Sequence, residues 1–120
     1  MRTAEHHDVR VLFVDPDGPQ IASTQDALDL VGEAFGCEAE LVAVPASRLS
    51  PEFFRLRSGL LGEVTQKLVN YRLRLAVVGD VTDHVAASDA FRDYVREANR
   101  GLHTWFVEDE AALVERLASA

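Results

Sequence analysis

Hydrophobic residues follow two different periods along this chain, and the segments that carry each period alternate. A strand is predicted at residues 8–15, DVRVLFVD, where apolar residues first alternate with polar ones and then run together. Three more apolar runs predict strands at residues 39–44, 73–79 and 102–107. The run at 73–79 contains four consecutive apolar residues, which is typical of a central strand covered on both faces.

Helical spacing of apolar residues fills most of the sequence between these strands. It predicts helices at residues 24–35, 51–71 and 88–100, and a closing helix capped by Asp109. The helix at 51–71 has Ser50 as its cap and a proline in its first turn. Its apolar stripe is formed by Phe53, Leu60, Val64, Leu68 and Tyr71. We expect this helix and the strand after it to organise the core.

The first strand is followed by a strong turn signal, the sequence DPDG at residues 15–18. Residues 19–22 then predict a short return strand, so that the chain opens with a hairpin, and residues 1–8 are expected to be a mobile lead-in. Strands that alternate with helices are typical of parallel pairing through right-handed crossovers. We therefore predict an α/β fold: a single layered domain at residues 9–120 with a mixed, mostly parallel sheet, an opening β-hairpin and about four helices.

Composition and charge narrow the functional classes. The chain is 48% hydrophobic and 27% charged, close to average globular usage, and its apolar runs are too short to span a bilayer. With 20 acidic residues against 12 basic ones the net charge is −8, which disfavours binding to nucleic acid and to anionic membranes. The single cysteine, Cys37, has no disulfide partner and belongs to no metal-ligand spacing. We expect a cytoplasmic protein with no metal site and no cofactor.

Acidic residues follow two of the core strands, at the ends where α/β proteins usually place their chemistry. Asp80, Asp83 and His84 follow one strand, and the run EDE at residues 108–110 follows the next. Carboxylates collected on one rim could hold Mg²⁺. The alternative, which we favour, is that these acids cap loops and helix starts or are solvated.

Arg57 is the charged residue that fits its surroundings least. In helical projection it lies about 40° from Phe53, among apolar neighbours. A charge in that position must be paired or must reach outward to water. One interpretation is a structural ion pair with Asp80 or another acid of the rim, and the other is binding of an anion or ligand.

Gly59 and Gly62 fall on the outer face of the same predicted helix. Each weakens helix propensity by about 1 kcal/mol relative to alanine. Small residues allow close approach of a partner helix or of a second copy of the chain, so both are candidates for an interface. The alternative is a helix that breaks at Ser58-Gly59, with Ser58 capping the second segment.

Several common functional motifs are missing. A phosphoacceptor receiver domain would use Asp15, Asp17 and Asp80 as its acidic cluster, but it needs a lysine where this chain has Glu108. No GxxxxGK[ST] or GxGxxG phosphate-binding sequence and no GxSxG nucleophile elbow occur.

Long segments of the chain resemble a known family. They are PEFFRLRSGLLGEVTQKLVNYRLRLAVVGD at residues 51–80, FRDYVREANRG at 91–101, WFVEDE at 105–110 and QDALDL at 25–30. Together they closely resemble the prokaryotic family known as domain of unknown function 4180. That resemblance implies a single domain and carries no established activity or catalytic residue.

A second resemblance, at the level of the fold, is to the STAS domains of anti-sigma-factor antagonists, which open with a hairpin and alternate helices with strands of a mixed sheet. In that family a phosphorylatable serine precedes Gly and Leu at a helix start, and Ser58-Gly59-Leu60 is similar to it. The family's preceding aspartate is replaced here by Arg57. Phosphorylation of Ser58 is thus a hypothesis that the resemblance implies.

These observations favour a non-catalytic regulatory or protein-interaction module, acting with a protein partner or as a homodimer, because no nucleophile with an adjacent base is evident. The alternative is a small-molecule or anion-binding protein, or a small enzyme, that uses the acidic rim with Arg57. The candidate ligand-binding residues are Arg57, Ser58, Asp80 and His84. A ligand-binding protein should show a concave pocket lined by Arg57, Asp80 and His84, whereas an interaction module should show an exposed patch around Gly59 and Gly62.

Overall fold

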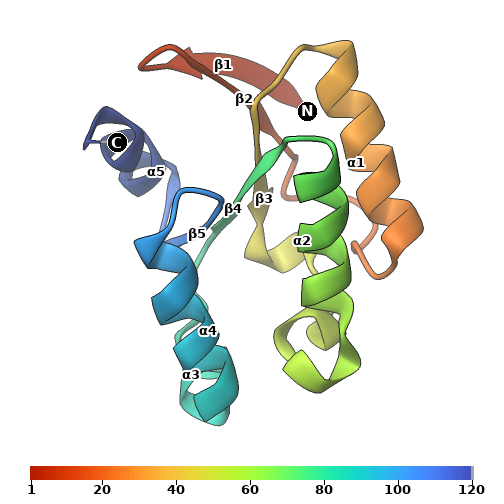
Figure 1. The fold of residues 1–120 in the computed structure, drawn as a ribbon, viewed down its shortest axis with the longest axis vertical. Helices are drawn as coiled ribbons and strands as arrows, with labels where there is room; N and C mark the ends of the chain where they lie inside the picture. Colours follow the sequence, from red (N-terminus) through yellow and green to blue (C-terminus); the bar gives the residue numbers. More distant parts are fainter. Residues whose placement is uncertain (120) are drawn as a thin grey trace.

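The computed structural model describes residues 1–119 and contains one five-stranded sheet with strand order β1-β2-β3-β4-β5 (Figure 1). The strands are β1 Arg2–His6, β2 Val9–Phe13, β3 Leu41–Pro45, β4 Arg74–Val78 and β5 Thr104–Val107. β1 pairs antiparallel with β2, and all the other neighbours are parallel. The predicted α/β class, with a mixed, mostly parallel sheet and an opening hairpin, is confirmed.

Within residues 1–119, five α-helices accompany the sheet, where the sequence predicted about four. They are α1 Thr24–Gly36, α2 Leu60–Asn70, α3 Thr82–Ala87, α4 Asp89–Arg100 and α5 Glu110–Ser119. The additional helix, α3, lies between the predicted strand at 73–79 and the predicted helix at 88–100, where the sequence pattern indicates a loop. It contains six residues and none of them is buried, so it lacks the long apolar stripe that a sequence pattern can detect.

The sheet separates two hydrophobic cores. On one face Leu12, Val42, Leu75 and Phe106 of the strands pack against α1, α2 and α4, which supply Val31, Leu61, Val64, Leu68 and Phe91 among others. On the other face alternate strand residues pack against Leu113 and Leu117 of α5. Figure 1 shows α1 and α2 running side by side, with α5 well away from them. The described residues include no helix long and apolar enough to cross a bilayer.

The hairpin lies earlier in the chain than predicted. Its strands are β1 and β2, so that residues 2–6 belong to the sheet instead of to a lead-in. The DPDG segment is a loop: Arg48 donates to the carbonyls of Asp15 (2.7 Å) and Pro19 (2.8 Å), and Ile21 forms a parallel bridge with Leu49. Because Ile21 bridges Leu49, residues 19–22 do not return along the first strand, and the predicted return strand is wrong.

The predicted continuous helix at 51–71 is also wrong. Residues 51–54 and 56–58 form two short 3₁₀ turns, Gly59 has a positive φ of 77°, and only then does α2 begin. The Ser58 hydroxyl bonds to carbonyl oxygens of the preceding turns and also accepts from the backbone N–H of Leu60 at 3.2 Å. The break at Ser58-Gly59, which the sequence left open as an alternative, is therefore found, but the residue at the N-cap of α2 is Gly59 and not Ser58.

Candidate functional site

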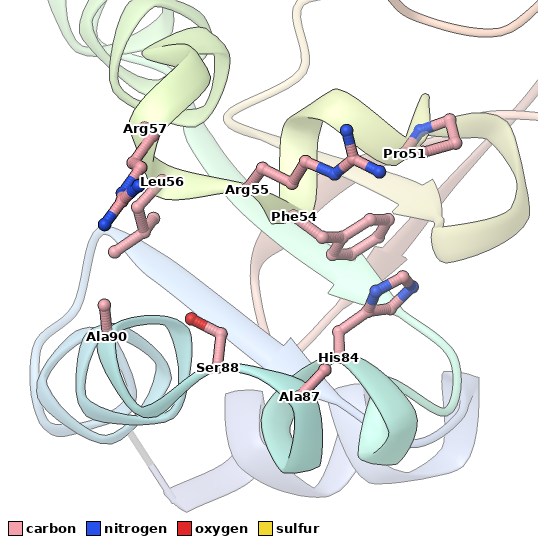
Figure 2. Close-up of a pocket in the computed structure, with 9 residues that line it drawn as sticks. All are labelled: Pro51, Phe54, Arg55, Leu56, Arg57, His84, Ala87, Ser88 and Ala90. Carbon is pink, nitrogen blue, oxygen red and sulfur yellow. The ribbon is translucent and has the colours of Figure 1, made fainter.

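A cleft opens between the two 3₁₀ turns and the α3–α4 segment. Its volume is about 570 Å³, within the range typical of small-molecule sites. Its walls come from two separate stretches of the chain, residues 51–57 on one side and residues 84–90 on the other (Figure 2). The lining residues are Pro51, Phe54, Arg55, Leu56, Arg57, His84, Ala87, Ser88 and Ala90.

Aromatic rings fix the relative position of the two walls. The imidazole of His84 stacks on the ring of Phe54, with centroids 3.9 Å apart and planes 7° apart. Phe54 is itself buried and meets the fully buried Phe91 edge to face at 5.7 Å. Figure 2 shows the Phe54 and His84 rings facing each other at one end of the cleft. Anchored rings of this kind give the cleft a rigid, flat, apolar surface.

Two arginines rim the upper wall of the cleft, and no acidic residue lines it. Arg55 pairs with Glu52 at 3.0 Å, and both side chains are exposed. Arg57 is exposed and forms no ion pair within residues 1–119. In Figure 2, Arg57 lies beside Leu56 and across the cleft from Ala90. Arg57 is therefore the arginine of the cleft rim that has no acidic partner within residues 1–119.

The predicted pairing of Arg57 with Asp80 is wrong. Arg57 leaves the apolar stripe because the chain here is 3₁₀ and not α-helical, which turns its side chain to solvent. Asp80 lines a different and smaller cavity, beside Val81 and Glu108. There it accepts bonds from both the N–H (2.9 Å) and the hydroxyl of Thr82, which lower the pKa of its carboxyl group.

The lower wall of the cleft includes the start of α4. Ser88 caps this helix by accepting from the N–H of Phe91 at 3.1 Å, and Ala90 lies in its first turn. The amino end of a helix carries partial positive charge and favours anions nearby. Asp89, in the first turn of the same helix, carries a negative charge that opposes this effect.

The acidic residues of the strand ends serve local structure. Asp109 accepts from the N–H of Ala112 at 2.8 Å at the start of α5, as the capping interpretation expects. Glu110 forms an ion pair with Arg2 of β1. In the part of the chain that the structure describes, no three His, Cys, Asp or Glu side chains come together as a metal-binding group.

The candidate interface residues lie near the cleft but outside its lining. Gly59 and Gly62 are both exposed, and a side chain added at either would meet nothing within 4 Å. Ser58 is exposed and also stands outside the lining, held by its bonds to the turns. Of the four predicted ligand-binding residues, the structure thus brings two together, Arg57 and His84.

Phe54, Leu56 and Ser88 also form the cleft, and sequence patterns gave them no such role. The adjacent phenylalanines at 53 and 54 are both buried, at 0% and 5% exposure. Neighbouring buried residues also occur within α1 and α2, so this pair gave no sequence signal for the 3₁₀ turns.

Fold and cleft together define a single-domain α/β protein with a cation-rimmed apolar pocket. The family model described as Domain of unknown function (DUF4180) matches residues 6–117, so the chain belongs to that family. Neither the curated proteins nor the solved structures include a significant match. The resemblance to STAS domains accordingly stays a prediction.

Proposed function

We propose that this domain is a non-catalytic, cytoplasmic regulatory module that binds a small anionic ligand in the cleft between residues 51–57 and 84–90. The observation that carries the proposal is Arg57, which has no ion pair within residues 1–119 and stands at the rim of a cleft that ends at the stacked Phe54–His84 pair. A ligand with a flat apolar body and one acidic group would match both features. Its body would lie against the rings and its anion near Arg57.

Other groups support binding over catalysis. His84 stacks on Phe54 in the cleft, whereas Asp80 is bonded to Thr82 in a different cavity. These two side chains, the proton-handling pair of an enzymatic alternative, therefore line separate cavities. A binding surface without a paired acid and base fits a sensor or a carrier.

Fluorescence titration tests the proposal. The probe is 8-anilino-1-naphthalenesulfonate, an aromatic sulfonate, and its uncharged analogue N-phenyl-1-naphthylamine measures the contribution of the anion. Loss of one charge-assisted hydrogen bond costs about 1.5–3 kcal/mol, so Arg57→Gln should weaken sulfonate binding by roughly tenfold or more. Affinity for the uncharged analogue should change little.

Arg96→Gln is the matched control, because Arg96 is also exposed, has no ion pair within the described residues and lies outside the cleft. It should bind both probes as the unaltered protein does. Equal sulfonate affinity in the Arg57 and Arg96 variants would refute an anion site at this cleft.

We further propose that the outer face of α1 and α2 receives a protein partner or a second copy of the chain. Phe35 and Tyr71 are 56% and 43% exposed, and their rings contact each other at 5.6 Å. Val69, 42% exposed, lies seven residues after Gly62 and therefore on the same face of α2. Sedimentation as a monomer at high micromolar concentration would contradict the homodimer.

A further inference from the structure

A second cavity lies at the opposite end of the sheet from the strand ends that carry Asp80 and Glu108. Its volume is about 590 Å³, and it is lined by His7, Val9, Arg74, Leu102, His103 and Leu117. These residues come from the β1–β2 turn, the starts of β2 and β4, the segment just before β5 and the last turn of α5. Figure 1 shows that the β1–β2 turn and the end of α5 lie near each other.

Two side-chain nitrogens in this wall are buried without a hydrogen-bond partner. They are Nη2 of Arg74 and Nε2 of His103, and in residues 1–119 the only other such atom is Oγ of Ser50. Buried polar groups in proteins nearly always have partners, so each exception requires an explanation. Two of the three exceptions belong to residues that line one cavity.

The remaining contacts of Arg74 hold its guanidinium in a fixed orientation. Nε donates to the carbonyl of Leu102 at 2.7 Å, and the group stacks 4.5 Å from the ring centroid of Trp105. Nη1 makes no hydrogen bond within the described chain, and it is accessible to solvent. With Nε engaged, the free edge of the group is the Nη1–Nη2 pair, which matches the two oxygens of a carboxylate.

The surroundings of this edge are positively charged. The guanidinium of Arg116 also lies 4.5 Å from the ring centroid of Trp105, and His7 is another residue of the cavity lining. Burial lowers the pKa of Arg74, and burial together with the Arg74 charge lowers that of His103. Glu40 is the acid that acts on Arg74, but it does not line the cavity.

We propose that this cavity binds a small organic acid, with its carboxylate on Arg74 and His103 and its apolar chain against Val9, Leu102 and Leu117. Such a ligand supplies acceptors for the unpaired nitrogens. It also covers Leu102, whose side chain is 68% exposed, the most exposed of the large hydrophobic residues. The site is separate from the cleft at Arg57, since the two share no residue.

Hexanoate is the probe, and hexan-1-ol, which has a chain of the same length and no charge, is its control. Two-dimensional ¹H–¹⁵N NMR should show hexanoate shifting the amides of residues 74, 102 and 103 and the indole N–H of Trp105, the only tryptophan. Arg74→Gln should weaken hexanoate binding by about tenfold. Arg57→Gln and Arg96→Gln should leave it unchanged.

Shifts that cluster at residues 54–57 and 84–90, equal effects of hexanoate and hexan-1-ol, or unchanged affinity in Arg74→Gln would each overturn the proposal. If Arg74→Gln does not fold, Arg74→Lys retains the charge without the two-pronged geometry, and His103→Gln removes the second donor. Both should then bind hexanoate more weakly than the unaltered protein. Because Arg57→Gln tests the cleft independently, failure at one site is distinguishable from failure at the other.

Discussion

At the scale of single residues, Arg57 and Arg74 both have N–H groups without a hydrogen-bond partner in residues 1–119, but the two side chains differ in burial. Arg57 is exposed and lacks an ion pair within residues 1–119, whereas Arg74 is partly buried and stacked on Trp105. An exposed arginine can pair with water at little cost, so Arg57 indicates a site only through the apolar cleft beside it. Arg74 indicates a site through its own unsatisfied nitrogen.

His103 should make stability depend on pH between about 5 and 7. Its pKa in the folded protein is lowered from the ordinary value of 6.5, first by burial and then by Arg74. Beyond that guanidinium lie Glu40 and Arg116, and the neighbouring hydroxyl is that of Thr104. The unfolded chain therefore binds more protons in this window, and the free energy of unfolding falls as the pH drops through 6.5 toward the lowered value.

Urea unfolding across this pH range measures the effect. In His103→Gln the decrease between about pH 7 and pH 5 should be smaller than in the unaltered protein. An unchanged pH profile would show that His103 titrates normally in the fold. The carboxyl of Asp80 has a lowered pKa, so its contribution is lost only at more acidic pH, below its ordinary value of 3.8.

At the scale of elements, the break before α2 creates the cleft. A continuous helix would carry Arg57 on the helical stripe near Phe53, but the two 3₁₀ turns and Gly59 separate residues 51–58 from α2. Both Phe53 and Phe54 are then buried, and Phe54 reaches His84. The irregular segment thus places Phe54 and the two arginines on one wall.

Gly59 and Gly62 should respond oppositely to alanine. Gly59→Ala should lower the free energy of unfolding by about 1 kcal/mol, because a φ of 77° is unfavourable for residues with a Cβ atom. Gly62→Ala should raise it by about 0.5–1 kcal/mol, since Gly62 lies within α2 with open space around it. Chemical denaturation of the two variants measures both values.

The two alanine variants also act as controls for each other, because the substitution is the same and the sites are three residues apart. A destabilising Gly62→Ala would show that the outer face of α2 is in close contact with something in solution. That outcome would favour the interface over an open helix surface.

At the scale of the whole molecule, buried parallel strands were the most predictable part. β3, β4 and β5 lie within the predicted segments or extend one residue past them, because runs such as LAVVG have no other stable environment than a sheet covered on both faces. β1 was missed since its sequence, RTAEH, is polar and mostly exposed. Its place is set by pairing with β2, which no local pattern reveals.

The site was predicted in part. Arg57 and His84 are 27 positions apart and line the same cleft, as the sequence suggested from their place near the ends of core elements. Asp80 was expected with them and lines another cavity, because its own hydrogen bonds to Thr82 start α3. Sequence patterns do not resolve 3₁₀ from α-helix over three or four residues, and the shape of the cleft depends on that difference.

Mapping where an aromatic sulfonate binds would test the central claim most directly. The measurement is the ¹H–¹⁵N NMR spectrum of the whole chain during titration with naphthalene-2-sulfonate. If the cleft is the binding site, the largest shifts will fall on amides of residues 54–57 and 84–90 and will vanish in Arg57→Gln but not in Arg96→Gln. Shifts absent from those residues, or equally large in the Arg57 variant, would contradict the account.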